Sequence, residues 1–235
     1  MSSVNIIQSA TSSLGLNPSN EGLWSAGFVA VVIGTVGILA RNRLAEKRNP
    51  IIPDERLTTC NALELLAEFI LNLSDNVMLK ENRKYIPFVA TVFFYVASMN
   101  LLGLLPGFSM PTDSFTINLG VALVVFVCYN YWGIREVGII NYTKHLWGPI
   151  FGIGLLLFPV EIISHIMRPV SLSIRLFGNM IGDHMVLEVF TDLTKAIIPV
   201  IFYGLGTFVS FVQAFVFTLL TMIYIRLAVA HDEGH

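Results

Sequence analysis

The chain has 235 residues, of which 54% are hydrophobic and only 13% are charged, whereas a soluble domain carries about a quarter charged residues. Its 14 Lys and Arg residues nearly balance 16 Asp and Glu residues, so no basic field for nucleic acid exists, and two cysteines form neither a disulfide framework nor a thiolate metal site. With a mean hydropathy of +0.71, the composition excludes a disordered chain and indicates a membrane protein.

Windows without charged residues organise the chain from its beginning. Residues 1–20 contain no Lys or Arg, so they lack the basic start of a cleaved signal peptide and are expected to form a polar external tail. About 20 apolar residues cross a hydrocarbon core of roughly 30 Å, and the windows lack the alternation of barrel strands, so each is predicted to be a transmembrane helix. Helices predicted in this way cover 22–42, 85–106, 114–134 and 196–228, and a fifth is predicted over 149–190, which is apolar but interrupted by charged residues.

Basic residues predict the orientation of these helices. They cluster in 41–56, 80–84 and 135–144, and the positive-inside rule places these clusters and the C-terminus in the cytoplasm, with the N-terminus outside. The segment 57–80 joins two cytoplasmic clusters, so it is not expected to cross. It is amphipathic and is predicted to lie in the interface or against neighbouring helices. We therefore expect an all-α polytopic membrane protein with one membrane domain over 1–235, five transmembrane helices and one amphipathic non-crossing helix.

The predicted helix over 149–190 carries ionisable residues, which are costly in a membrane and are therefore functional hypotheses. On a straight helix of about 100° per residue, one polar stripe follows Arg175, and a second polar pair lies on roughly the opposite side. The stripe contains Glu161, His165, Arg168, Arg175, Asn179 and Asp183, and the pair is His184 and Glu188.

The last predicted helix also has features that are unusual for a simple bundle. The uncharged window 196–225 would be about 45 Å long, which exceeds the hydrocarbon thickness by about half, so both long C-terminal helices are expected to be strongly tilted. Gln213 is an amide in the middle of this window and requires a polar partner, for which Arg175 is the expected one.

The residues alone suggest three kinds of site. Glu161/His165 and His184/Glu188 have a spacing that could ligate a metal, but the pairs lie on different faces, so no metal site is predicted. A hydrolase lacks a nucleophile with a base, and no phosphate-binding or dinucleotide motif is present, so no catalytic site, nucleotide or cofactor is expected. The stripe instead suits ion translocation, because intramembrane acids and His relay protons and an Arg supplies a barrier charge.

Residues 168–184, RPVSLSIRLFGNMIGDH, resemble the central segment of subunit a of F-type ATP synthases, which has the pattern S-L-x-x-R-L-F-G-N-M. Further similarity lies in NLLGLLPG at 100–107, PTDSFTINLGVAL at 111–123 and QAFVFTLLTMIYI at 213–225. The resemblance extends from about residue 20 to the end of the chain.

This resemblance implies a stator that packs two long tilted helices against the rotating c-ring and provides two proton half-channels. Arg175 matches the family's essential arginine opposite the c-ring carboxylate. Asn179 and Gln213 match its polar neighbours, Glu161 matches an acidic position in the family's helix, and His184 stands where members have Glu or His. The position that often pairs with it on the last helix is Gly206 here. Residues expected to line the half-channels are Asp183, His165, Asp113, Asn118 and Ser210.

The resemblance also implies the surroundings of the chain. Its partners would be the c-ring, the b subunits of the peripheral stalk, membrane lipid and, indirectly, the F1 ATPase head. The expected place is a bacterial inner membrane, with an organelle-encoded subunit as the second reading. Proton is the expected ion and sodium the alternative, because the c-ring sets the choice. A different class of function, an independent secondary transporter of a small solute or ion, stays open from the physics of the residues alone.

Overall fold

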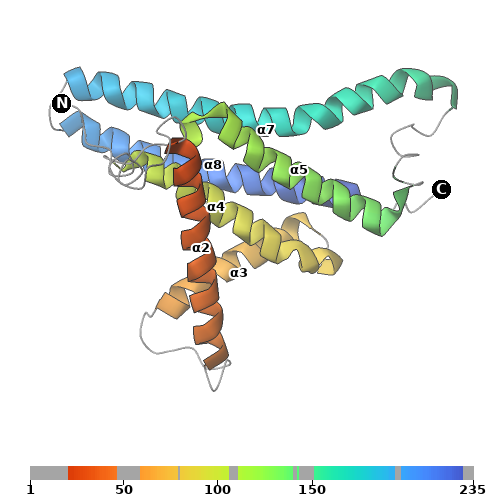
Figure 1. Ribbon diagram of the computed structural model, residues 1–235, viewed down its shortest axis with the longest axis horizontal. Coiled ribbons are helices and arrows are strands. Elements are labelled where there is room, and N and C mark those ends of the chain that lie inside the picture. The colour runs from red at the N-terminus through yellow and green to blue at the C-terminus, as the bar shows by residue number, and fades with distance from the viewer. Residues whose placement is uncertain are drawn as a thin grey trace. The chain divides into compact units, whose positions relative to one another are not determined.

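The computed structural model describes residues 21–46, 59–78, 80–105, 111–139, 142, 151–193 and 197–229. Within these ranges the protein is helical and has no strand, which confirms the predicted all-α class (Figure 1). The helices are α2 (Glu21–Glu46), α3 (Thr59–Val77), η2 (Lys80–Tyr85), α4 (Ile86–Leu104), η3 (Pro111–Asp113), α5 (Phe115–Val137), α7 (Phe151–Leu193) and α8 (Ile197–Val229). The expected external tail 1–20 lies outside the described residues.

Four of these helices are long and apolar enough to cross a membrane. The candidate spans are Gly22–Leu39, Arg83–Leu104, Phe115–Val137 and Val200–Val229. α7 is not among these spans, although its 43 residues would extend for about 65 Å at 1.5 Å per residue. The fifth crossing and the interfacial position of α3 therefore stay predictions.

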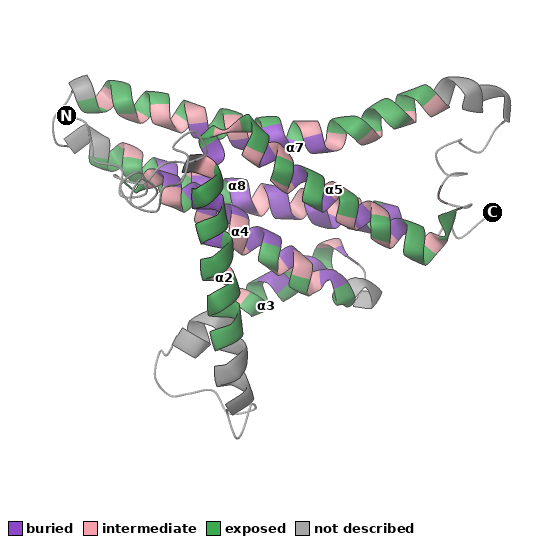
Figure 2. Ribbon diagram, in the orientation of Figure 1, coloured by how far each residue is buried: buried purple, intermediate pink, exposed green. Residues whose placement is uncertain are grey.

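The chain divides into two compact units, Met1–Pro111 and Thr112–His235. In the first, α4 packs against both α2 and α3. The phenol of Tyr95 on α4 donates to the carbonyl of Ala26 on α2 over 3.4 Å, and the ring of Phe93 lies 6.5 Å from that of Phe69 on α3. Most of the described side chains of α2 are exposed (Figure 2), which is the pattern of a helix that faces lipid.

The second unit is a group of three helices, α5, α7 and α8, each in contact with the other two. α5 ends where Gly138 adopts a φ of 82°, and the Gly138 amide donates to the carbonyl of Ile134 over 3.0 Å. α5 and α8 approach closely at Gly133, because a Cβ there would lie 2.8 Å from the carbonyl oxygen of Ala228. The small residue at this crossing sets the spacing of the two helices.

α7 runs without interruption through two internal prolines, Pro159 and Pro169, and it is curved rather than straight (Figure 1). A proline has no amide hydrogen and clashes with the carbonyl four residues earlier, which is the usual cause of such bending. Near its end, α7 is joined to the start of α8 by the stacked rings of Phe190 and Phe202, with centroids 4.4 Å apart. The ionisable residues of α7 are therefore held in one continuous element.

Candidate functional site

Arg175 lies near the middle of α7, at the border between its buried and exposed sides. Leu172 and Leu176 beside it are 2% and 3% exposed, while the Arg175 side chain is half-buried. Within the described residues, that side chain makes no hydrogen bond, ion pair or ring contact. A guanidinium carries a fixed positive charge, and no group in the described part of the chain balances it.

Small residues surround Arg175 on the exposed side of α7. Ser171 and Gly178 are exposed, and so is Gly182 one turn further on. A Cβ added at Gly178 or Gly182 would meet nothing within 4 Å, so the space next to the helix is open at both positions. Another helix can come unusually close to the backbone here.

Asn179 and Gln213 form the polar contact between α7 and α8 next to Arg175. The Asn179 Nδ2 donates to Gln213 Oε1 over 2.6 Å. The expected bond between Gln213 and Arg175 was therefore wrong, because Asn179 lies one turn further along the same face and its short amide reaches the Gln213 oxygen directly. Gln213 is 4% exposed, and its Nε2 has no hydrogen-bond partner in the described part of the chain.

The buried face of α8 continues from Gln213 towards the beginning of the helix. Ser210 is 3% exposed and Gly206 is buried as well, so both small residues face into the unit rather than outward. Gly206 brings no titratable group to this face. Proton transfer along it would have to use the side chains of α7 or bound water.

A second set of predicted residues gathers around His184 and is called the His184 group: Asp113, Asn118, Asp183 and His184. The charges of Asp113 and Asp183 act on the half-buried His184. Asn118 is 1% exposed, and its Nδ2 donates to the carbonyl of Thr112 over 2.7 Å, next to Asp113 in the chain. The buried Asn118 Oδ1 and Thr112 Oγ1 have no partner among the described residues, so the group offers two oxygens that water can satisfy.

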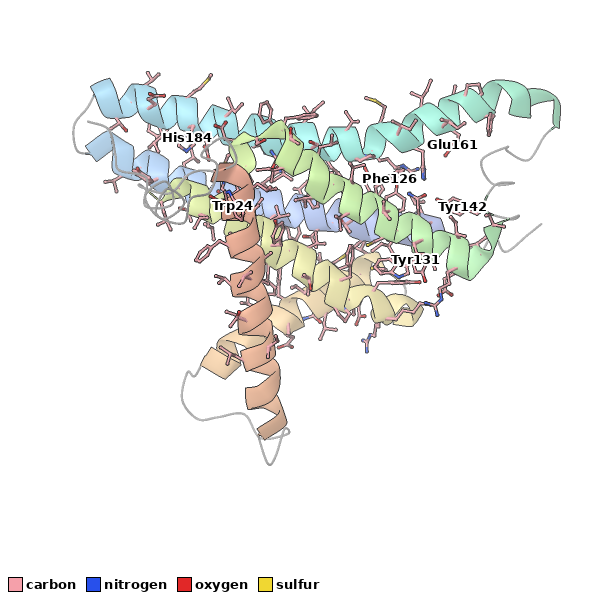
Figure 3. The ribbon with its side chains drawn as sticks, in the orientation of Figure 1. Trp24, Phe126, Tyr131, Tyr142, Glu161 and His184 are labelled. Carbon is pink, nitrogen blue, oxygen red and sulfur yellow. The ribbon has the colours of Figure 1, made fainter. Side chains whose placement is uncertain are left out.

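A third set, called the His165 group, lies towards the other end of α7: Asn130, Tyr142, Glu161, His165 and Arg168. His165 Nε2 and Asn130 Oδ1 are 2.7 Å apart, and the Tyr142 hydroxyl donates to the same oxygen over 2.6 Å. The Arg168 guanidinium lies 5.3 Å from the ring centroid of Tyr224 on α8. Figure 3 shows Tyr142 and Glu161 at this end of the unit, with His184 far along α7.

The structure thus distributes the predicted site residues over three places along α7, with Arg175 between the His184 and His165 groups. Sequence reasoning did not single out Asn130 or Tyr142. Asn130 could have been found by the argument applied to Gln213, because it is an amide inside the uncharged window 114–134. Tyr142 carried no such signal, since it stands in a polar loop.

Comparison with known proteins places these features in a family context. The family model described as ATP synthase A chain matches residues 23–226. A protein of Bdellovibrio bacteriovorus named ATP synthase subunit a is 42% identical over 88% of this chain and 90% of its own length. One of the same name from Helicobacter hepaticus is 39% identical over 94% and 95%, and one from Sulfurimonas denitrificans is 44% identical over 74% and 79%.

Proposed function

The chain belongs to the ATP synthase A chain family, and from this premise we propose that it is the stator subunit a of a proton-translocating ATP synthase. Its role is in ATP synthesis and proton transport, as a membrane-sector subunit that leaves nucleotide chemistry to other subunits. Its apolar helices suit a multi-pass membrane protein. The proposal places it in a bacterial inner membrane, in contact with the c-ring and the peripheral stalk.

The observation that carries the mechanism is that the charge of Arg175 is not paired within the described residues. It is a half-buried guanidinium in mid-helix without an anionic partner among the described residues. A charge in a membrane segment is costly unless it is paired or hydrated. In the proposed mechanism, the pairing anion is the carboxylate of a passing c subunit, which approaches over the open backbone at Gly178 and Gly182.

The faces of α7 and α8 that remain uncovered support contact with a neighbouring hydrophobic subunit. Their exposed side chains include Ile163, Met167 and Ile174 on α7, and Leu205, Phe208 and Val212 on α8. A ring of apolar helices would cover such faces, as lipid also would. The arginine beside them marks the place where a charged group has to pass.

The two polar groups supply the ends of two half-channels. The positive-inside rule puts the His165 group near the cytoplasm, because Arg135 ends α5 and Arg226 ends α8. The His184 group then lies towards the outside, about 13 Å along the helix from Arg175. In the proposed path, a proton passes the His184 group to a c-ring carboxylate and leaves past Glu161 after nearly a full turn of the ring.

Arg175 separates the two paths by its charge. At about 4 Å and an effective dielectric constant near 20, a unit charge pair gains on the order of 4 kcal/mol, which corresponds to about 3 pKa units. The pairing lowers the pKa of the approaching carboxylate, so the carboxylate gives up its proton before it passes the arginine. A fixed cation also repels protons that would move directly from one path to the other.

The composition of the native complex tests the assignment. Purification in a mild detergent through a tag on this chain should recover a ring of small hairpin subunits, peripheral-stalk subunits and a soluble ATPase head. Isolation of the chain alone, with transport of a solute after reconstitution, would instead support the independent transporter. The matched control is the same tag on an unrelated multi-pass protein of the same membrane.

A further inference from the structure

The side-chain oxygen of Asn130 is shared by two donors from different parts of the second unit. The Tyr142 hydroxyl lies 2.6 Å from Asn130 Oδ1, and His165 Nε2 lies 2.7 Å from it. Tyr142 follows α5 in the chain, Asn130 belongs to α5, and His165 belongs to α7. One amide oxygen on α5 therefore binds both Tyr142, which follows α5, and His165 in the first half of α7.

The orientation of the Asn130 amide follows from its other contact. Its Nδ2 donates to the carbonyl of Phe126 over 2.7 Å, and a carbonyl can only accept. Oδ1 is then an acceptor towards both neighbours, so His165 must carry its proton on Nε2, and a second proton would add at Nδ1. The hydrogen bond to Asn130 therefore persists whether the imidazole is neutral or charged.

Tyr142 stays a donor under physiological conditions. Burial raises the pKa of Tyr142 above its usual value of 10.0, and the charge of Arg168 opposes this increase only in part. The rings of Phe126, Tyr129 and Tyr142 lie 5.2, 5.8 and 6.5 Å from the imidazole. They limit the movement of the His165 ring, while the charged neighbours Glu161 and Arg168 lie one turn before and after it on α7.

The backbone next to this contact lacks one of its helical bonds. Pro169 has no amide hydrogen, and the carbonyl that such a hydrogen would reach is that of His165, four residues earlier. The helix is thus weakened between the residue that is tied to α5 and the segment that leads to Arg175. Arg175 follows His165 by about 15 Å along the axis.

We propose that Asn130 is a positioning residue, which holds α7 through His165 at this proline and thereby fixes where Arg175 stands. The proposal rests on the proposed role of Arg175 in proton translocation. The contribution of His165 is its Nε2 donor, and a titrating imidazole is not required. An amide at the same position should therefore replace it.

Four variants in the intact complex test the donor. His165→Leu and Asn130→Leu remove the tie, and we expect ATP-driven proton pumping to fall about fivefold, the effect of one lost hydrogen bond on an equilibrium. His165→Gln keeps an N–H donor, so its pumping should be clearly faster than that of His165→Leu; the pumping of Tyr142→Phe should lie between that of the parent and that of His165→Leu. Normal pumping by His165→Leu would overturn the proposal, and so would a loss in His165→Gln as large as in His165→Leu.

A distance measurement makes the test independent of activity. Val124 on α5 and Val189 on α7 are exposed, and neither is assigned to the face that meets the c-ring, so spin labels at Val124→Cys and Val189→Cys, with Cys60 and Cys128 replaced by Ala, report on the two helices. The distance distribution should broaden with His165→Leu and stay narrow with His165→Gln. An unchanged distribution in His165→Leu would overturn the positioning role. A failure of the proposed function would appear in the purified composition and leave this measurement intact.

Discussion

Among single residues, Arg175 and the amides near it show how charge and hydrogen bonding are divided on α7. Asn179 and Gln213 bond to each other over 2.6 Å, which leaves the guanidinium without a partner in the described residues. A second arginine, Arg168, is placed over the ring of Tyr224 and is satisfied within the unit. The contrast indicates that Arg168 contributes to the packing of α7 against α8, whereas the guanidinium of Arg175 can pair with a group of another subunit.

Substitution of Arg175 should abolish coupling in both directions. Arg175→Ala and Arg175→Lys should each leave the complex assembled and remove proton-driven ATP synthesis, because Lys lacks the planar fork and can lose its proton when buried. Arg175→Ala should also allow passive proton leak through the membrane sector of stripped vesicles. The matched control is Arg135→Ala, which removes an exposed guanidinium at the end of α5. Substantial coupled synthesis by an intact Arg175→Ala complex would contradict the assigned role.

His184 is expected to contribute by taking up and releasing a proton rather than by packing. It is half-buried, and carboxylates on two elements act on it. An ordinary His titrates near pH 6.5, so it can both take and release a proton under physiological conditions. We predict that His184→Ala slows ATP-driven pumping several-fold and that His184→Glu largely preserves it, as measured by acidification of inverted vesicles. Equal and normal pumping by both variants would reduce His184 to a packing residue.

At the scale of elements, the helix bounds could be predicted closely, because long apolar segments separated by polar ones favour helices. The segment predicted at 85–106 is α4 (Ile86–Leu104), and that predicted at 149–190 is α7 (Phe151–Leu193). The assumption that α7 is straight predicted its faces less well, since Pro159 and Pro169 bend the helix. The partners of His165 and Gln213 could not be derived, because spacing along one helix does not state which residue of another helix meets it.

The crossing of α5 and α8 provides a test of packing. A Cβ at Gly133 would lie 2.8 Å from both the Ala228 carbonyl oxygen and Tyr142 Cε2, so Gly133→Ala should force the helices apart. Overpacking of this kind costs about 1–3 kcal/mol. We predict a lower thermal midpoint and lower yield of assembled complex for Gly133→Ala. Gly120→Ala on the same helix, where a Cβ meets nothing within 4 Å, is the control and should behave like the parent.

At the scale of the whole molecule, the contacts of the second unit agree with one orientation in the membrane. Asn130 near the end of α5 meets His165 in the first half of α7, and Tyr224 near the end of α8 meets Arg168. The ends of α5 and α8 that carry Arg135 and Arg226 therefore lie towards the same end of α7. The positive-inside rule assigns both ends to the cytoplasm independently of these contacts.

Cysteine labelling tests this orientation. In a background without Cys60 and Cys128, Lys47→Cys, Asn82→Cys and Lys144→Cys should all react with an impermeant maleimide in inverted vesicles and resist it in intact cells. A cysteine in the N-terminal tail, at Ser12, should show the opposite pattern. Opposite labelling of positions 47 and 82 would mean that α3 crosses the membrane.

The length of α7 has a consequence for motion. As one element of 43 residues, about 65 Å long, it is roughly twice as long as the hydrocarbon core is thick, so in the proposed function we expect it to run obliquely through the layer. On an inclined helix, each step in depth is also a step sideways. In the proposed mechanism, the half-channels at His165 and His184, about 28 Å apart along the axis, would therefore meet the rotor at different points of its circumference. An upright helix would place both openings over one point, so in the proposed mechanism the slope of α7 is the feature that obliges a proton to travel with the rotor between them.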